Sequence, residues 1–171
     1  LDGQGNPNAE FLFQAVTTMA FGVGSTIILI NGASAENILW VAGTTFFAGA
    51  NTNFVGSILA GTTVAVGAGS EVNGRVIPLT GVTFGASTEV HGCVVALTGV
   101  TFGADNSVNA GPIYRDTEPS PDPCYSVCEN FAVHAETAIT RTGAIINGGD
   151  VGIKQLDPGP VKKNHAAAWK I

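Results

Sequence analysis

The sequence predicts an all-β fold: a β-solenoid whose coils have a triangular cross-section and a period of 18 residues. Three stretches align without gaps, namely GSILAGTTVAVGAGSEVN (56–73), GRVIPLTGVTFGASTEVH (74–91) and GCVVALTGVTFGADNSVN (92–109). A weaker fourth stretch, ILWVAGTTFFAGANTNFV (38–55), precedes them at the same spacing. Eighteen residues suit one coil of three short strands with a corner after each, and the β-branched residues and glycines disfavour a helix.

The composition narrows the classes of function. The 171 residues are enough for one domain with its own core. Charged residues make up 12% of the chain, about half of the usual share, so small polar and apolar side chains must cover the surface. The net charge of −6 argues against nucleic-acid binding, and no apolar run is long enough to insert into a membrane.

The first strand of each coil has an apolar outward side. Because side chains alternate along a strand, Ile58, Val76 and Val94 point into the core. The outward positions then hold Leu, Ile and Val, which is not a solvent-facing pattern, so we expect a helix or a partner to cover them. These positions, the apolar row, are Leu59, Ile77, Leu79, Val95 and Leu97.

The second strand of each coil has an outward side that is small, flat, uncharged and regular. Its inward positions hold valine and phenylalanine, and a threonine stands at the corner before each strand. This pattern makes the face the candidate binding surface. Its residues are Thr44, Thr45, Thr62, Thr63, Ala65, Thr80, Gly81, Thr83, Thr98, Gly99 and Thr101.

The third strand presents an ordinary solvated face with Glu71, Glu89 and His91. His91 is expected to be a surface residue rather than a metal ligand. The two glutamates stack one coil apart, but a catalytic pair needs a pocket that shifts a pKa, and this face offers no groove. We therefore expect no catalytic residues, no cofactor and no metal, and a protein that is not an enzyme.

The three cysteines leave two alternatives open. Cys124 and Cys128 lie in a Pro-rich stretch, and the repeat places Cys93 on the outward side of its strand. A disulfide between Cys124 and Cys128 suits a secreted protein, whereas the alternative is three free thiols. A zinc site is not expected, because Cys124 and Cys128 have no second pair of ligands at the spacing that zinc sites use.

The first two thirds of the chain resemble the microbial ice-binding domain of the DUF3494 type. The matching segments are GNPNAEFLFQ (5–14), STIILINGASAENILWVAG (25–43), FVGSILA (54–60) and VNGRVIPLTGVTF (72–84). The resemblance implies a right-handed β-helix with one α-helix along a face, and that helix would cover the apolar row. Some members of the family carry the motif T-A/G-x-T/N on the face that binds ice.

This motif occurs here as Thr80-Gly81-Val82-Thr83 and Thr98-Gly99-Val100-Thr101. Thr62-Thr63-Val64-Ala65 and Thr44-Thr45-Phe46-Phe47 are degenerate versions of it. The last version departs from the pattern, because a bulky Phe47 would interrupt a flat face.

A second resemblance concerns the end of the chain. CENFAVHAETAIT…INGGDVGI (128–153) resembles the amino-terminal segment of the same family, and VKKNHAAAWKI (161–171) resembles the start of its covering helix. We therefore divide the chain into solenoid coils (1–110), a Pro-rich linker (111–127) and a segment like the N-terminal cap and helix start of the same or the next domain (128–171).

Three explanations fit this order of segments. The chain is cut from a tandem array, it is a circular permutant, or successive copies complete one another head to tail. The resemblance implies a secreted or cell-surface protein that binds ice or its surface water. The alternative function is a structural or adhesive extracellular protein, assembled as a filament from neighbouring copies, for which ice is irrelevant.

Overall fold

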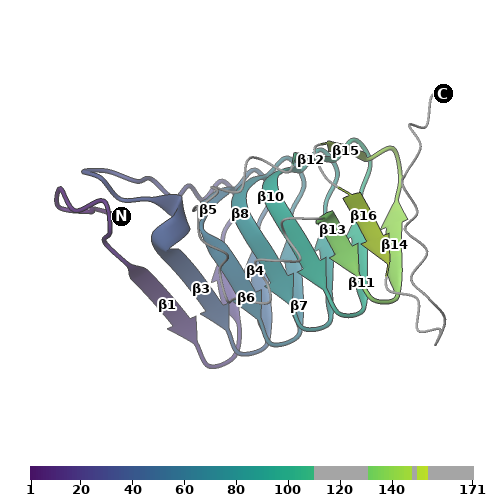
Figure 1. Cartoon of the computed structure of the whole chain (residues 1–171), viewed down its shortest axis with the longest axis horizontal. Helices are drawn as coiled ribbons and strands as arrows, with labels where there is room; N and C mark the ends of the chain where they lie inside the picture. The colour runs from purple at the N-terminus through teal and green to yellow at the C-terminus, as the bar shows by residue number, and fades with distance from the viewer. Residues whose placement is uncertain (110–130, 148–149, 154–171) are drawn as a thin grey trace.

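The computed structural model describes residues 1–109, 131–147 and 150–153 of the chain. In this part, strands stack side by side in two sheets and build an elongated solenoid with β1 at one end and β14 at the other (Figure 1). Every pairing between strands is parallel, as expected for a chain that winds repeatedly in one sense. The predicted β-solenoid is confirmed.

The larger sheet has ten strands and forms two sides of each coil. Its first-strand column joins the first strands of successive coils, and its third-strand column joins the third strands. The strands are β1 (Phe11–Ala15), β3 (Ile38–Ala42), β5 (Asn53–Val55), β6 (Ser57–Ala60), β8 (Glu71–Pro78), β10 (Glu89–Ala96), β12 (Ser107–Asn109), β13 (Phe131–Ala135), β15 (Ile145–Asn147) and β16 (Asp150–Ile153).

The smaller sheet has six strands and forms the remaining side. A single 3-10 turn, η1 (Ala35–Asn37), is the one helical element among the described residues. The predicted helix start at 161–171 lies outside the described residues. The strands of the six-stranded sheet are β2 (Met19–Phe21), β4 (Thr45–Ala48), β7 (Thr63–Val66), β9 (Gly81–Phe84), β11 (Gly99–Phe102) and β14 (Ala138–Arg141).

In two coils the third strand continues into the first strand of the next coil, whereas we expected a corner between them. The continuous strands are β8 and β10, and Gly74 and Gly92 stand at the junctions. Their φ angles are +150° and +146°. A Cβ on Gly92 would lie 2.0 Å from the Gly74 carbonyl oxygen. Only glycine combines this φ with so close an approach of two backbones, which is why the strand can bend without breaking.

The core is a set of columns of identical or similar side chains. Val64, Val82 and Val100 stack in register and are at most 3% exposed, as predicted. Phe84 and Phe102 stack with ring centroids 5.2 Å apart and planes 9° apart. Such columns bury a continuous apolar interior that no single coil could bury alone.

The corner between the second and third strands holds two further columns. Asn51, Ser87 and Asp105 have positive φ angles of 56°, 55° and 57°, at the position where another coil carries Gly69. These residues form a tight turn that precedes the third strand. Inside the corner lies a buried polar column made of Thr52, Ser70, Thr88 and Asn106.

The solenoid continues beyond the insertion at residues 110–130. β13 pairs with β10, β14 with β11 and β15 with β12, so residues 131–147 add one more coil. β16 then pairs with β13 and begins another level. The predicted division at 110 and the linker at 111–127 fall largely outside the described residues, so the division into domains stays a prediction.

Cys93 departs from its predicted environment. Its side chain is 2% exposed, although the adjacent Val94 occupies the inward position, and it is disulfide-bonded. The chain has two other cysteines, so a bond that includes Cys93 is incompatible with a bond between Cys124 and Cys128. The predicted Cys124–Cys128 disulfide is therefore wrong. A pairing between a strand and a distant segment depends on tertiary proximity, which local spacing does not report.

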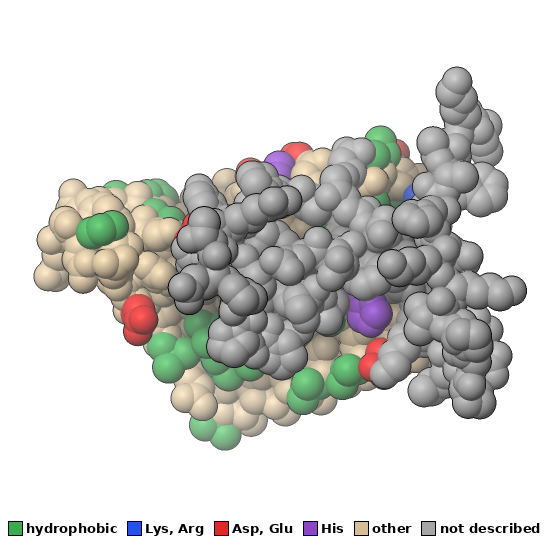
Figure 2. Space-filling view, in the orientation of Figure 1, with side chains coloured by type: hydrophobic (Ala, Val, Ile, Leu, Met, Phe, Trp, Pro, Cys, Tyr) green, Lys and Arg blue, Asp and Glu red, His purple; other side chains and the backbone are tan. Residues whose placement is uncertain are grey.

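The apolar row lies on the outer side of the first-strand column. Leu59 pairs with Ile77 on the neighbouring strand, and Leu79 and Leu97 are 52% and 47% exposed. On the side shown in Figure 2, hydrophobic side chains of the described residues appear at intervals along the solenoid. That a helix or a partner covers the row stays a prediction.

Candidate functional site

The outer surface of the six-stranded sheet is the candidate site. Burial alternates along its strands: in β9 and β11 the valine and phenylalanine are buried, while Thr83 and Thr101 are exposed. The same alternation in β7 leaves Thr63 exposed and Ala65 half-buried. The structure thus brings the predicted residues of this face together on one surface.

A row of threonines runs along the corner that precedes these strands. Each coil's threonine donates its backbone N–H to the carbonyl of the threonine one coil before it. The donors are Thr44 to Thr17, Thr62 to Thr44, Thr80 to Thr62, Thr98 to Thr80 and Thr137 to Thr98, with distances of 2.7 to 2.9 Å. The corner row therefore has the strand spacing of the sheet, about 4.8 Å.

A second row of threonines runs parallel to the corner row. Thr83 pairs in register with Thr101, and Thr101 pairs with Thr140. Between the two rows lie Gly81, Gly99 and Ala138, whose small side chains form a shallow floor. Added bulk does not fit easily there, because a Cβ on Gly81 would lie 3.0 Å from the Gly99 carbonyl oxygen.

The last coil of this face was missed from the sequence. Thr137-Ala138-Ile139-Thr140 fits the motif T-A/G-x-T/N, and β14 places it in register with Thr98-Gly99-Val100-Thr101. Its Thr137, Ala138 and Thr140 are exposed. The insertion at 110–130 breaks the 18-residue period, so the repeat did not reveal this coil. A search for the motif without the period would have found it.

The other end of the face is less regular, as predicted. Phe47 points outward from β4 and is 46% exposed. Its neighbours in register are Ala20 and Ala65, so one bulky ring stands between two small side chains. The flat part of the face therefore extends from β7 to β14.

The face carries no charge in the described residues. Outward positions of its six strands hold Thr, Ala, Gly and Phe47, with no Asp, Glu, Lys or Arg among them. Threonine hydroxyls are linked within the face, for example Thr45 Oγ1 to Thr63 Oγ1 at 3.4 Å. Thr62 Oγ1 donates to the Thr44 carbonyl at 2.8 Å. These bonds and the stiffness of β-branched side chains limit the motion of the methyl and hydroxyl groups.

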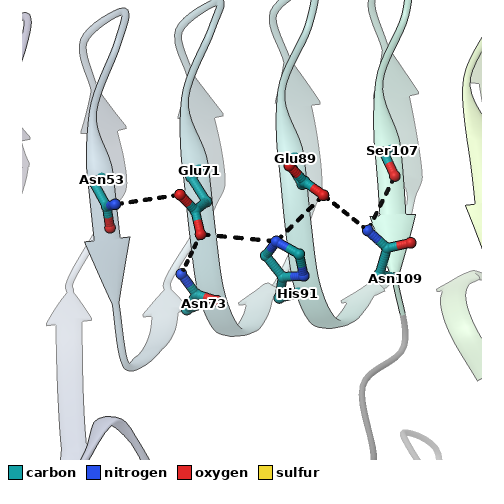
Figure 3. Close-up of polar contacts among 7 residues, drawn as sticks. All are labelled: Asn53, Glu71, Asn73, Glu89, His91, Ser107 and Asn109. Carbon is teal, nitrogen blue, oxygen red and sulfur yellow. Dashed lines mark hydrogen bonds and ion pairs between the residues drawn. The ribbon is translucent and has the colours of Figure 1, made fainter.

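Polar groups are concentrated instead on the third-strand column (Figure 3). His91 Nε2 lies 3.3 Å from Glu89 Oε1 and 3.7 Å from Glu71 Oε1. The amides of Asn73 and Asn109 donate to the same two carboxylates at 2.9 and 3.0 Å. His91 and the two glutamates are 37 to 49% exposed, so this network is a solvated surface ladder.

Neither a metal centre nor a membrane span is found in the described part of the chain. Among these residues, no group of three His, Cys, Asp or Glu side chains is arranged to hold a metal ion. None of the described helices has the length and hydropathy needed to cross a bilayer.

Comparison with known proteins places this geometry in a family. The model of the family described as ice-binding-like matches residues 1–88, which is slightly more than half of the chain. The chain belongs to the ice-binding-like family. The matched residues include β1 to β9, and therefore most strands of the threonine face.

Three relatives of this ice-binding-like chain are named as ice-binding proteins. It is 43% identical over 61 residues to "Ice-binding protein 1" of Shewanella frigidimarina, which is 35% of this chain and 7% of the relative. It is 40% identical over 60 residues to "Ice-binding protein" of Nostoc sp., 35% of this chain and 22% of the relative. The match to "Ice-binding protein" of Lentinula edodes is 36% over 55 residues, 32% of this chain and 19% of the relative. The chain thus spans less than a quarter of each relative, and no solved structure matches it.

Proposed function

We propose that this chain binds ice through the outer face of β7, β9, β11 and β14. The observation that carries the proposal is the double row of threonines in register across β9, β11 and β14, on an uncharged surface with a floor of glycine and alanine between the rows. Family membership and the names of the three relatives support it. The chain acts by binding, without catalysis.

The mechanism depends on a fixed lattice of small groups. Threonine methyl and hydroxyl groups repeat along the solenoid at the spacing of neighbouring strands, about 4.8 Å. The corner row and the second row repeat at this same spacing. A rigid surface of this kind orders the water above it, and the ordered layer joins the crystal. Little side-chain entropy is lost on docking because β-branched side chains have few rotamers. Charged groups would hold water in other geometries, and this face has none.

The test is to disturb the face at its centre. Thr83→Tyr and Thr101→Tyr place bulky rings into the second row of threonines while leaving the core columns intact. We expect each variant to lose most of the thermal hysteresis and ice-recrystallisation inhibition of the parent chain. Glu89→Tyr, on the solvated face of the larger sheet, is the matched control and should keep both activities. Unchanged activity in the two threonine variants would show that another surface binds ice.

We further propose that the chain works outside the cell or at its surface. The disulfide at Cys93 supports this, since such bonds persist in oxidising compartments. A structural or adhesive role is the second candidate, and the exposed Leu79 and Leu97 of the apolar row favour it, because they offer a surface for a partner. Absence of any ice activity in the parent chain, together with fibres seen by electron microscopy, would favour the second candidate over the first.

A further inference from the structure

The outer face of the six-stranded sheet has two columns of outward side chains, and threonine changes from one column to the other between β7 and β9. The inner column lies next to the corner row, and the outer column lies two residues, or about 6.6 Å, farther along the strands. From β4 to β14, the inner column consists of Thr45, Thr63, Gly81, Gly99 and Ala138. The outer column consists of Phe47, Ala65, Thr83, Thr101 and Thr140. Each of these coils thus has one threonine besides its corner threonine, and its column depends on the coil.

The threonine hydroxyls also differ between these two parts of the face. Before the change of column they bond to one another or to the backbone. Thr18 Oγ1 lies 3.5 Å from Thr44 Oγ1, and Thr45 Oγ1 lies 3.4 Å from Thr63 Oγ1. Thr62 Oγ1 donates to the Thr44 carbonyl at 2.8 Å. From β9 onwards, within the described part of the chain, no such bond is made by the hydroxyls of Thr80, Thr83, Thr98, Thr101, Thr137 and Thr140. These hydroxyls are left to bond with water.

We infer that the column in which the threonine stands decides which coils contact the ice lattice. This inference rests on the proposed ice binding and names the residues that set its specificity. The lattice consists of the corner row and the outer-column threonines of β9, β11 and β14, with the inner column as the floor between them. β7 contributes its corner threonine, Thr62, but its second threonine lies in the other column. The double row therefore ends at the step between β7 and β9.

The change of column disturbs the match to a crystal surface in three ways. An ice surface is periodic, so threonines that coincide with its sites over β9 to β14 are displaced by about 6.6 Å over β4 and β7. The side chains of Thr45 and Thr63 fill the floor that stays open above Gly81 and Gly99. The ring of Phe47, 46% exposed, occupies the outer column. All three differences weaken contact on the same side of the step.

The first test compares one threonine from each column. Thr63→Ala and Thr101→Ala remove the same groups from exposed positions of the same sheet. We expect Thr101→Ala to lower thermal hysteresis about twofold or more, since it removes a central member of the lattice, and Thr63→Ala to cause a much smaller loss. Equal losses would show that both columns contact ice. That result would overturn the inference and leave the proposed function intact.

The second test moves the threonine of β7 into the outer column. Thr63→Gly combined with Ala65→Thr gives this coil the threonine–glycine–valine–threonine order of residues 80–83. We expect thermal hysteresis to rise by about a third or more, because the double row grows from three coils to four. Thr63→Gly alone is the matched control. It opens the floor without supplying an outer-column threonine, so it should give no increase.

Circular dichroism and thermal unfolding establish that each variant is folded before its ice activity is measured. A folded double variant that gains no activity over the parent overturns the inference. An unfolded double variant leaves the decision to Thr63→Ala and Thr101→Ala. A parent chain without thermal hysteresis, or one whose activity survives both Thr83→Tyr and Thr101→Tyr, refutes the proposed function itself. These last results differ from those that overturn only the role of the column.

Discussion

Thr101 and Thr140 lie in register on neighbouring strands, although residues 102–139 separate them in the chain. The pairing of β11 with β14 extends the double threonine row by a coil that follows the insertion. It assigns Thr137 and Thr140 to the proposed ice-binding face on geometric grounds.

The first prediction concerns this added coil. Thr140→Tyr should reduce thermal hysteresis by a factor similar to that of Thr101→Tyr, because both residues belong to the same row. Arg141 follows Thr140 and is exposed, but it lies in register with Phe102 and not with the threonines of the face. Arg141→Lys also keeps the charge, so it should leave the activity unchanged and serves as the control. Full activity of folded Thr140→Tyr would limit the face to the coils before the insertion.

The second prediction tests the bent strands. Gly92→Ala should destabilise the protein by roughly 2–5 kcal/mol, because its Cβ would meet a backbone oxygen and its φ is positive. Gly24→Ala has a positive φ as well, yet nothing lies within 4 Å of its Cβ, so about 1–2 kcal/mol is expected. Chemical denaturation measures both values. Equal losses would mean that the close backbone approach costs nothing beyond the φ angle.

The third prediction concerns the corner with left-handed residues. Ser87 has a φ of 55°, where a neighbouring coil carries Gly69. Ser87→Gly should stabilise the chain by about 0.5–1 kcal/mol, since it removes the left-handed strain and adds a smaller entropy cost. In contrast, Ser107 begins strand β12, where the backbone is extended and glycine only adds an entropy cost, so Ser107→Gly should destabilise by a similar amount. A lower midpoint of thermal unfolding for Ser87→Gly would contradict the strain argument.

The fourth prediction concerns the buried polar column. Asn106 accepts from Thr88 N–H at 2.8 Å, while its buried Nδ2 finds no acceptor among the described residues. A serine in the same column, Ser70, both accepts from Thr52 N–H and donates to the Gly49 carbonyl. Asn106→Ser should therefore raise the free energy of unfolding by about 1 kcal/mol, and Asn106→Ala should lower it by about 1–2 kcal/mol. Equal free energies of unfolding for Asn106→Ser and Asn106→Ala would contradict this argument.

The fifth prediction concerns acid. The backbone N–H of Gln4, and then the side-chain amide of Asn31, hold the pKa of the Asp2 carboxyl below its ordinary value of 3.8. A lowered pKa adds stability above the ordinary value, and this stability is lost as the pH falls through the lower, folded-state value. Asp2→Asn should therefore unfold at a lower temperature than the parent near neutral pH, with the difference shrinking at pH values well below 3.8. A difference that is constant with pH would assign the effect to another cause.

Several features could be predicted because they depend only on period and alternation. The valine column of Val64, Val82 and Val100 and the exposed Thr83 and Thr101 follow from an 18-residue repeat and the two-residue period of a strand. The interruption at Phe47 follows from side-chain size alone. Each of these is a local property of a regular coil.

The remaining features depend on contacts between distant segments. The placement of Thr140 requires knowing that β14 pairs with β11 across the insertion, and the bond at Cys93 requires knowing which segment meets β10. The sequence shows a glycine at the start of each repeat, including Gly74 and Gly92. The reason for these glycines is the close approach of one backbone to the next, which only the structure shows. Composition and periodicity do not contain this information.

The register between β11 and β14 is unbroken despite the extra residues, and this affects how the protein can evolve. Added chain at the corner after Asn109 shifts no side chain of the face, so that corner tolerates new sequence. Duplication or loss of a whole repeat would lengthen or shorten the surface by about 4.8 Å and leave its lattice unchanged. Selection can therefore change the area of the contact surface in steps of one repeat, and it can do so independently of changes at the corner after Asn109.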